Sequence, residues 1–467
     1  MKKMLIFLSV LSYLHANAQF SKIFDFAGDS IGKQPYGSLY SDGTFLYGMT
    51  SSGGAYNWGT IFKVKPDGTG YVNLHSFAYQ TIDGQTPQGS LISDGTFLYG
   101  VAQNGGAFLG GVLFKIMPDG TGFTILYQFH FNQEMFPAGT LLYDGTSLYG
   151  LSTGGSGSGY GNYDRGTVFK INPDGSGYTN LHYFAGSDGS YPRGSLISDG
   201  TYLYGTTFYG GSSPDWSGCG TAFKIKSDGS GFVELAEFDG LHIGATRNGC
   251  QPAGDLIFDG KFLYGMTRSG GTSSEGNIFK ISTDGSGYQD VFDFNRSNGR
   301  FPSGSLISDG TYLYGMTSGG GLLDSGIVFK VKPDGTAFSD LHDFSRAAGF
   351  FPYGSLLKNG DTLYGMTFAG GAICDSGIVF KYCLTKDVAQ PTTFKLYPNP
   401  GNGIFTLQTT DQANQLMLLY DVIGRIVFSQ VINVTTSIDA GNLEKGVYIV
   451  SLITEKGVFN KRLVIAR

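Results

Sequence analysis

The chain has 467 residues, a formal net charge of −6, and 75 glycines beside 29 tyrosines and 37 phenylalanines. Charged residues make up only 15% of it, and this glycine-rich, aromatic-rich composition is typical of short strands joined by tight turns. Nucleic-acid binders carry basic patches that neutralise phosphates. An acidic chain without a basic run excludes that class, so we expect no nucleic-acid partner.

The first segment, residues 1–18, has the features of an export signal. Lys2-Lys3 precedes a short apolar run, and Ala16-Asn17-Ala18 offers a small-residue cleavage site. We therefore expect cleavage between Ala18 and Gln19. The apolar run is well short of the roughly 20 residues that span a bilayer, and no later segment comes closer, so we expect no transmembrane segment.

Seven copies of one pattern follow, spaced about 50 to 60 residues apart. Each copy carries Pro-x-Gly-[Ser/Thr/Asp]-Leu, then [Asp/Asn]-Gly, Leu-Tyr-Gly, Gly-Gly and Phe-Lys. The first copy begins at Pro35 and the last ends at Phe380-Lys381. A fixed period of this size indicates a repeat architecture.

Each copy predicts four short antiparallel strands. In the first copy we expect strands near residues 38–41, 44–49, 60–64 and 71–77, with Asp-Gly pairs as hairpin turns. Such a sheet cannot bury both faces alone, whereas radial packing against similar sheets buries them. The predicted fold class is all-β: a seven-bladed β-propeller with four-stranded blades. An open β-solenoid is the alternative.

The two ends of the repeat region favour a closed ring. The seventh copy stops after its third strand, and residues 20–26 align with the fourth strand of the first copy, residues 71–77. The N-terminal strand would therefore complete the last blade and remove an exposed edge. We expect the propeller to occupy residues 19–383.

The Leu-Tyr-Gly, Gly-Gly and Phe-Lys units resemble the GloVer tandem repeats of bacterial surface proteins and, more distantly, kelch blades. The resemblance covers residues 20–383 and implies surface display without a known reaction. The tryptophans of kelch repeats are absent from the third strands of these copies.

A polar linker, residues 384–393, leads to a different segment, residues 394–467, whose alternating strand patterns predict a small β-sandwich. Its motifs resemble the type IX secretion (Por) sorting domain of Bacteroidetes. The motif residues are Tyr397, Pro398, Asn399, Pro400, Gly424, Gly446 and Tyr448. The resemblance implies a type IX secretion machinery as partner and transport from the periplasm across the outer membrane to the cell surface or beyond. An accessory binding sandwich is the alternative.

The loops after the diglycines and the connections between blades are expected on one face of the ring. Aromatic side chains gather there in the first four copies and offer flat faces to sugars or partner proteins. The ligand-binding candidates are Tyr56, Trp58, Phe108, Tyr160, Tyr163, Tyr209 and Trp216. The alternative is that these rings fold back over the blades as packing.

Catalytic and metal chemistry have weaker support. The same loops carry the carboxylates Asp164, Asp215, Glu275, Asp324 and Asp375. A glycosidase needs two such groups roughly 5 to 9 Å apart, and nothing in the sequence pairs them, so no catalytic residue is assigned. His75, His182 and His342 share one strand position but belong to different copies, so we expect no metal site and no cofactor.

The four cysteines belong to an exported chain, which can keep disulfides. Cys219 lies in a loop of the fourth copy and Cys250 in the connection to the fifth, so both are expected on one face and a disulfide between them is predicted. Cys374 and Cys383 flank a third strand at opposite ends, beyond the roughly 7 Å between Cα atoms that a disulfide allows. We expect those two to be unpaired.

These features predict a secreted, monomeric cell-surface propeller that acts as a non-catalytic binding or adhesion module, for glycan or for a surface protein. A polysaccharide-processing enzyme that uses loop carboxylates is one alternative. A passive structural surface protein is the other.

Overall fold

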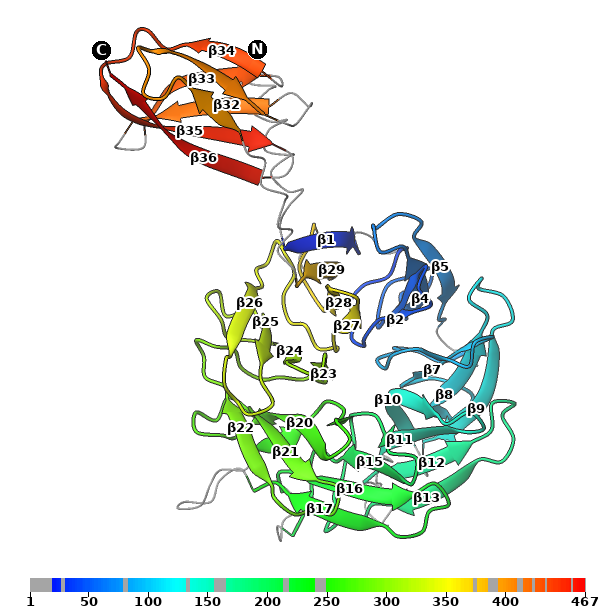
Figure 1. Ribbon diagram of the computed structural model, residues 1–467. Coiled ribbons are helices and arrows are strands. Elements are labelled where there is room, and N and C mark those ends of the chain that lie inside the picture. Colours follow the sequence, from blue (N-terminus) through cyan, green and yellow to red (C-terminus); the bar gives the residue numbers. More distant parts are fainter. Residues whose placement is uncertain are drawn as a thin grey trace. The chain divides into compact units, whose positions relative to one another are not determined.

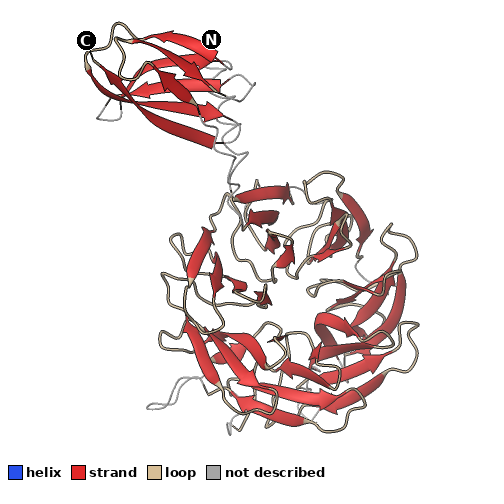
Figure 2. Cartoon of the chain, viewed as in Figure 1, coloured by secondary structure: helices blue, strands red, loops and turns tan. Residues whose placement is uncertain are grey.

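The computed structural model describes residues 19–26, 30–78, 83–131, 135–154, 165–212, 218–239, 249–372, 376–384, 394–409, 415–421, 425–432, 435–454 and 457–466. The predicted export signal, residues 1–18, and most of the predicted linker lie outside these ranges. Figure 2 shows strands and loops throughout. Among the described residues, none forms a helix with the length and apolar character that crossing a membrane requires. The chain divides into two compact units, residues 22–382 in one and residues 1–21 with 383–467 in the other.

The larger unit is a ring of antiparallel sheets, seven of them in its described part (Figure 1). Six of these sheets have four strands, with the first nearest the centre of the ring and the fourth at the outside, whereas blade five has five strands because β18 and β19 both pair with β20. Blade one has β2 (Tyr40–Ser41), β3 (Leu46–Thr50), β4 (Thr60–Val64) and β5 (Val72–Ser76); blade two has β6 (Ile92–Ser93), β7 (Leu98–Ala102), β8 (Leu109–Ile116) and β9 (Thr124–His130); blade three has β10 (Met135–Tyr143), β11 (Leu148–Gly154), β12 (Thr167–Ile171) and β13 (Thr179–Tyr183).

The remaining blades follow the same order. Blade four has β14 (Ile197–Ser198), β15 (Tyr202–Thr206), β16 (Thr221–Lys226) and β17 (Val233–Glu237); blade five has β18 (Cys250–Pro252), β19 (Ile257–Phe258), β20 (Phe262–Ser269), β21 (Asn277–Ser282) and β22 (Gln289–Asp293). Blade six has β23 (Ile307–Ser308), β24 (Leu313–Thr317), β25 (Ile327–Val331) and β26 (Ser339–Asp343); blade seven has β27 (Leu357–Asn359), β28 (Thr362–Thr367) and β29 (Ile378–Cys383), completed by β1 (Phe20–Asp25).

The N-terminal strand closes the last blade, as the split repeat predicts. Strand β1 pairs with β29, so residues from both ends of the repeat region share one sheet. The backbone N–H of Phe26 donates to the carbonyl of Gly377 at 3.2 Å, and the N–H of Cys383 donates to the carbonyl of Gln19 at 2.8 Å. The all-β propeller fold with this closing strand is therefore confirmed.

The glycine of each Leu-Tyr-Gly unit makes room for the phenylalanine of Phe-Lys. Gly48 pairs with Phe62 across β3 and β4, and the same pairing recurs in every blade. A Cβ atom at any of these glycines would lie within 2.7 Å of the tip of the partner ring. The two motifs recur together because one fills the space that the other leaves.

The Asp-Gly turn is held by the tyrosine of Leu-Tyr-Gly. In blade one, Asp42 accepts hydrogen bonds from the Thr44 and Phe45 N–H groups at 2.8 and 2.7 Å and from the Tyr47 hydroxyl at 2.8 Å. Burial alone would raise the pKa of Asp42, but these bonds outweigh it and lower the pKa. Gly43 beside it has a φ of 90°, which suits glycine.

The hydrophobic core lies between neighbouring blades, not within one sheet. One cluster joins Tyr47, Met49 and Ile61 of blade one to Leu98 and Phe114 of blade two. Another joins blade seven to blade one and includes Phe26 after the closing strand. Full burial of such a side chain contributes about 1.5–3 kcal/mol, so each blade depends on both neighbours.

The smaller unit is a β-sandwich of two sheets in its described part. One sheet has β30 (Lys395–Tyr397), β31 (Ile404–Gln408) and β34 (Thr435–Asp439). The other has β33 (Ile426–Ile432), β32 (Gln415–Tyr420), β35 (Gly446–Thr454) and β36 (Gly457–Ile465). Apolar side chains from both sheets form one core, among them Phe405, Leu419 and Val450.

Candidate functional site

The glycine of each Pro-x-Gly motif lies where neighbouring blades meet near the axis. The seven glycines, Gly37, Gly89, Gly139, Gly194, Gly254, Gly304 and Gly354, form a closed ring. A Cβ atom at any of them would lie within 2.6 Å of the carbonyl oxygen of the next, and Gly354 meets Gly37 in this way. The motif therefore requires glycine because backbones meet there, and the seventh contact closes the circle.

A second ring, of hydrogen bonds, runs beside the glycines. At six junctions a backbone N–H donates over 2.6–2.7 Å to a side-chain oxygen of the next blade. The donor–acceptor pairs are Ser38–Ser90, Thr140–Ser195, Ser195–Asp255, Asp255–Ser305, Ser305–Ser355 and Ser355–Ser38. Asp255 is the one carboxylate in this set, at a position where the other blades carry a hydroxyl.

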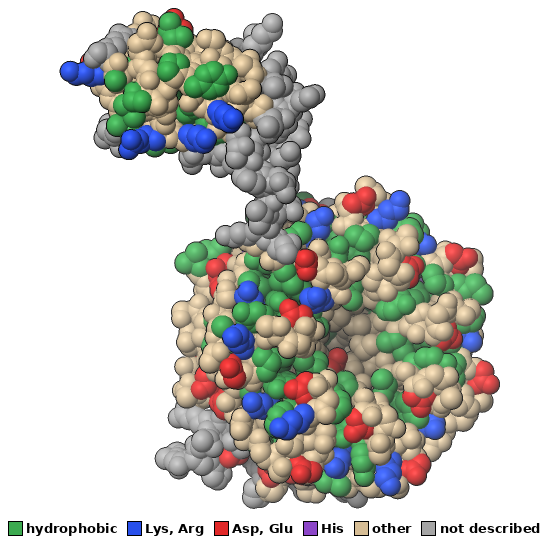
Figure 3. Space-filling view, in the orientation of Figure 1, with side chains coloured by type: hydrophobic (Ala, Val, Ile, Leu, Met, Phe, Trp, Pro, Cys, Tyr) green, Lys and Arg blue, Asp and Glu red, His purple; other side chains and the backbone are tan. Residues whose placement is uncertain are grey.

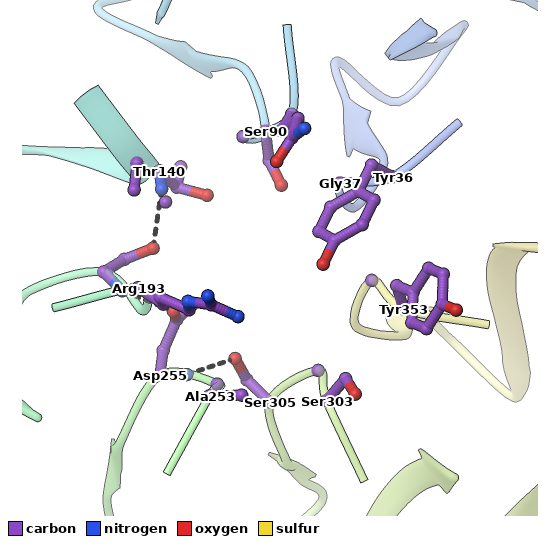
Figure 4. Close-up of a pocket in the computed structure, with 18 of the residues that line it drawn as sticks. Tyr36, Gly37, Ser90, Thr140, Arg193, Ala253, Asp255, Ser303, Ser305 and Tyr353 are labelled. Atoms are coloured by element: carbon purple, nitrogen blue, oxygen red, sulfur yellow. Dashed lines mark hydrogen bonds between the residues drawn. The ribbon is translucent and has the colours of Figure 1, made fainter. Parts of the chain in front are cut away.

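These rings surround a pocket of about 600 Å³ at the centre of the propeller. Figure 3 shows the surface hollowed there, and Figure 4 shows side chains from several blades converging on it. We name it the axial pocket. A concave site of this volume with converging polar groups is of the size that small ligands occupy.

The middle residue of each Pro-x-Gly motif lines the axial pocket. These residues are Tyr36, Gln88, Ala138, Arg193, Ala253, Ser303 and Tyr353. A second set, Gln103, Thr153, Phe208, Arg268 and Phe368, stands at or just after the ends of the second strands. Nearly uniform motifs thus place seven varied side chains around one cavity.

Backbone geometry orients these residues in the same way in every blade. The residue before each motif proline has a φ between 50° and 62°, in the left-handed region. These residues are Gln34, Thr86, Phe136, Tyr191, Gln251, Phe301 and Phe351. Because the conformation recurs in all blades, it belongs to the repeat's architecture, although Phe136 and Tyr191 also line the pocket.

The side chains of the axial pocket are unevenly distributed. Tyr36 and Tyr353 stack with ring centroids 5.0 Å apart, and Phe368 packs edge-on against Tyr353 at 5.3 Å. They come from blades seven and one. Arg193 comes from blade four and Arg268 from blade five, and the Arg193 guanidinium lies 4.0 Å from the centroid of Phe208.

Burial sets the electrostatics of two pocket groups. It raises the pKa of the Asp255 carboxyl, against the opposing effect of hydrogen bonds from Ser195 and Ser305. Burial also raises the pKa of Tyr353, with a further contribution from neighbouring Tyr36, while the charge of Arg268 acts to lower it. Arg268 is thus close enough to Tyr353 for its charge to act on that hydroxyl.

The predicted ligand-binding aromatics do not line the axial pocket where they are described. Tyr56 is 60% exposed and Phe108 is 47% exposed, with Phe108 stacked on His130 at 3.7 Å. Trp58 is half-buried and packs against the core between blades one and two. Tyr209 contacts Tyr191 at the pocket rim, with ring centroids 5.9 Å apart. The other three candidates, Tyr160, Tyr163 and Trp216, lie outside the described residues.

Two of the five loop carboxylates, Glu275 and Asp324, lie in the described part of the chain. Asp324 is bound by Arg296 at 2.6 Å and by Arg300 at 3.0 Å. Glu275 lies one blade earlier in the chain, in the loop before β21. Asp164, Asp215 and Asp375 lie outside the described residues.

The histidines of the fourth strands contact aspartate and phenylalanine side chains near them. His75 lies 3.2 Å from Asp83 and stacks on Phe123, and His182 lies 2.9 Å from Asp188. Burial lowers the pKa of His342 to about 4. No three histidine, cysteine, aspartate or glutamate side chains come together in a metal-binding arrangement within the described ranges.

A disulfide joins the loops of blades four and five. The Cα atoms of Cys219 and Cys250 are 4.5 Å apart, and the bond spans a sequence separation of 31 residues. The N–H of Gln251 also donates to the Cys219 carbonyl at 2.7 Å. Cys383 is half-buried at the end of β29, and Cys374 lies outside the described residues.

The sorting motif ties the start of the smaller unit to its last strand. The Asn399 side chain donates to the Arg462 carbonyl at 2.7 Å and accepts from the Val464 N–H at 2.8 Å. Tyr448 donates to the Glu444 carbonyl at 2.9 Å. Tyr397, Pro398 and Pro400 flank Asn399, Gly446 begins β35, and Gly424 lies outside the described residues.

Sequence reasoning missed the axial pocket, although a signal for it exists. The glycine and the hydroxyl residue of Pro-x-Gly-Ser are almost uniform among copies, whereas the residue between proline and glycine varies from alanine to arginine and tyrosine. Variation inside an otherwise fixed motif marks a position that packing does not constrain.

Two family models match the sequence. The Gloeobacter/Verrucomicrobia repeat matches residues 9–163 and 241–417, and the secretion system C-terminal sorting domain matches residues 395–466. Both resemblances drawn from the motifs are thereby confirmed. No match was found among curated proteins.

Solved structures share the fold at low sequence identity. An oligogalacturonate lyase in complex with manganese is 13% identical with a TM-score of 0.51, over 79% of this chain and 94% of that chain. An oligogalacturonate lyase from Vibrio parahaemolyticus is 12% identical with a TM-score of 0.52, over 78% and 93%. A puromycin-hydrolyzing peptidase from Mycobacterium tuberculosis is 12% identical with a TM-score of 0.50, over 84% and 61%. Similarity at this level shows the fold alone.

Proposed function

The chain belongs to the Gloeobacter/Verrucomicrobia repeat family, and from that premise we propose that it is a cell-surface binding module whose ligand, a glycan, occupies the axial pocket. The C-terminal sorting domain directs export by type IX secretion to the cell surface or the extracellular space. At that location polysaccharides are abundant and accessible. The proposal assigns the chain recognition and no reaction.

The observation that carries the proposal is the convergence of varied residues on one cavity. Seven blades share their turns, glycines and core, yet each contributes a different or differently placed side chain to the axial pocket. Hydroxyls and amides, as in Ser303 and Gln88, can bond sugar hydroxyls, and Tyr36, which stacks on Tyr353 through one face, can offer its other face to a sugar ring. Structural repeats without a ligand would gain nothing from this variety.

Binding has more support than hydrolysis at this site. Glycoside hydrolysis by the common mechanism uses two carboxyl groups flanking the scissile bond. Among the described residues that line the axial pocket, Asp255 is the single carboxyl group, and it is engaged by the Ser195 N–H at 2.6 Å. The pocket therefore offers contacts for a saccharide but lacks the pair that would cleave one by this route.

Affinity electrophoresis of the secreted chain through gels that contain individual polysaccharides tests the proposal. We expect at least one polysaccharide to retard the wild-type protein and to release no new reducing ends. Ala253→Trp places a large side chain in the axial pocket and should abolish the retardation. Thr44→Trp, in an exposed hairpin turn outside the pocket lining, should not.

Two results would contradict this function. Retardation that survives Ala253→Trp, with an unchanged unfolding midpoint, would exclude the axial pocket as the binding site. New reducing ends that accompany retardation would identify an enzyme instead.

A further inference from the structure

Two arginines of the axial pocket have no anionic partner. Arg193 and Arg268 are exposed and line the cavity. Within the described ranges, neither has a carboxylate oxygen within 4.0 Å, whereas Arg296, Arg300 and Arg425 all form ion pairs. Arginine is suited to bidentate recognition of planar anions, and an unpaired guanidinium at a concave site is available for a ligand.

An aromatic ring supports the Arg193 guanidinium without using its N–H donors. Arg193 lies over Phe208 at 4.0 Å, whereas Arg268 lies 5.9 Å from the centroid of Phe301, a ring that is closer to Arg300. A cation over an aromatic face leaves its N–H donors available to other partners. Figure 4 shows Arg193 reaching into the axial pocket. Part of the entropy cost of ordering Arg193 is thus met before a ligand arrives.

The pocket is positive although the chain is acidic. The whole sequence carries a net charge of −6, so its general field repels anions. Inside the pocket, two guanidinium groups face one carboxyl, Asp255, which already accepts a hydrogen bond from the Ser195 N–H at 2.6 Å. An anion that binds this chain must therefore gain its attraction locally, from the pocket and not from the surface as a whole.

The pocket combines charged and aromatic groups that come from different blades. The arginines come from blades four and five, while Tyr36, Tyr353 and Phe368 come from blades one and seven. Arg193 lies across the pocket from Tyr36 (Figure 4), whereas Arg268 is close enough to Tyr353 for its charge to act on that hydroxyl. A ligand that fills the cavity would therefore meet both guanidinium groups and aromatic rings, and a sugar ring that carries an acidic group suits both.

We propose that the axial pocket selects an acidic saccharide, holding its carboxylate or sulfate group with Arg193 and Arg268 while the sugar ring packs against Tyr36 and Tyr353. This inference rests on the proposed glycan-binding function and adds the class of ligand. The guanidinium groups explain selection of an anion, and the aromatic side explains selection of a sugar over a free ion.

The test compares matched polymers in affinity electrophoresis of the full secreted chain. Polygalacturonate and its fully methyl-esterified form differ in charge but share a backbone, while dextran sulfate and dextran repeat the comparison for sulfate. We expect retardation by an acidic polymer, lost on esterification or in its neutral counterpart. Arg193→Met and Arg268→Met should each weaken binding at least about tenfold, because each removes a charge-assisted bond. Arg296→Met, an equal charge change on an exposed arginine outside the pocket lining, should leave binding unchanged.

The possible outcomes distinguish the selectivity for acidic saccharides from the glycan-binding function on which it rests. Retardation by polygalacturonate or by dextran sulfate, sensitive to both pocket arginines, supports the inference and identifies the anionic group. Equal retardation by acidic and neutral polymers, blocked by Ala253→Trp, keeps the binding function but overturns the acidic selectivity. A loss of binding in Arg296→Met equal to that in the two pocket variants also overturns the acidic selectivity. No retardation by any polymer contradicts the binding function itself.

Discussion

The disulfide between blades four and five allows a stability prediction with a magnitude. It connects residues 31 apart in sequence, and closing a loop of that length removes about 12 cal/mol/K of entropy from the unfolded chain. At 25 °C this corresponds to about 3.7 kcal/mol of stability. The double variant Cys219→Ala/Cys250→Ala should therefore lose about 3.7 kcal/mol in the free energy of unfolding.

Urea unfolding followed by circular dichroism measures this loss. The matched control is Cys383→Ala, which changes a cysteine of β29 that is not part of the Cys219–Cys250 bond. Reduction of the wild-type protein should lower its free energy of unfolding to that of the double variant. Reduction of the Cys383→Ala control should lower its free energy of unfolding by the same amount. A loss below about 1 kcal/mol would refute the reasoning, because it would show that the disulfide removes much less entropy from the unfolded chain than closure of a loop of this length predicts.

Three further predictions concern other parts of the ring. Burial and the charge of Asp293 raise the pKa of Asp290 to about 7. The folded state therefore loses stability as pH rises from about 4 to about 7. In thermal unfolding, Asp290→Asn should be more stable than wild type at pH 8 but not at pH 4. Gly354→Ala would press a Cβ atom against the Gly37 carbonyl and should lower the free energy of unfolding by about 3 kcal/mol. Gly43 has a φ of 90° and open space around it, so Gly43→Ala should lower it by about 1 kcal/mol. Urea unfolding measures both losses. Asp255→Ser restores the hydroxyl of the other blades and removes a buried carboxyl, so its melting temperature should rise at pH 8 relative to wild type.

Much of the fold follows from sequence because the repeat shows each residue's role seven times. The positions that do not vary among copies reveal the pairing of Leu-Tyr-Gly with Phe-Lys and the Asp-Gly hairpins. The fourth strand that the last copy lacks reveals the closing strand at residues 20–26. Local turn chemistry and strand periodicity determine these features, so they need no knowledge of distant contacts. The crowding of the axis also follows from the glycines.

The pocket could not be located in this way, because it depends on the radial direction of single side chains. A strand of two residues, such as β2, gives no periodicity from which to tell which neighbour faces the axis. Exposed aromatics such as Tyr56 give a clear signal in sequence, whereas Arg268 lies at the end of a strand and looks like an ordinary surface residue. Only the assembly of the blades around one axis brings its charge within reach of Tyr353.

Within the five residues of the Pro-x-Gly-Ser-Leu motif, some positions stabilise the ring and another faces the ligand pocket. In blade one Gly37 contacts the next blade, Ser38 joins the ring of hydrogen bonds, and Leu39 is buried in the core, so each of these is constrained by a neighbour. Tyr36 between proline and glycine lines the cavity, where it is half-buried and stacks on Tyr353, and it makes none of these three contacts. Its substitution removes a ring contact but leaves the glycine ring, the hydrogen bonds and the core in place. The ligand of the axial pocket can therefore change through these seven positions while the ring that holds them stays the same.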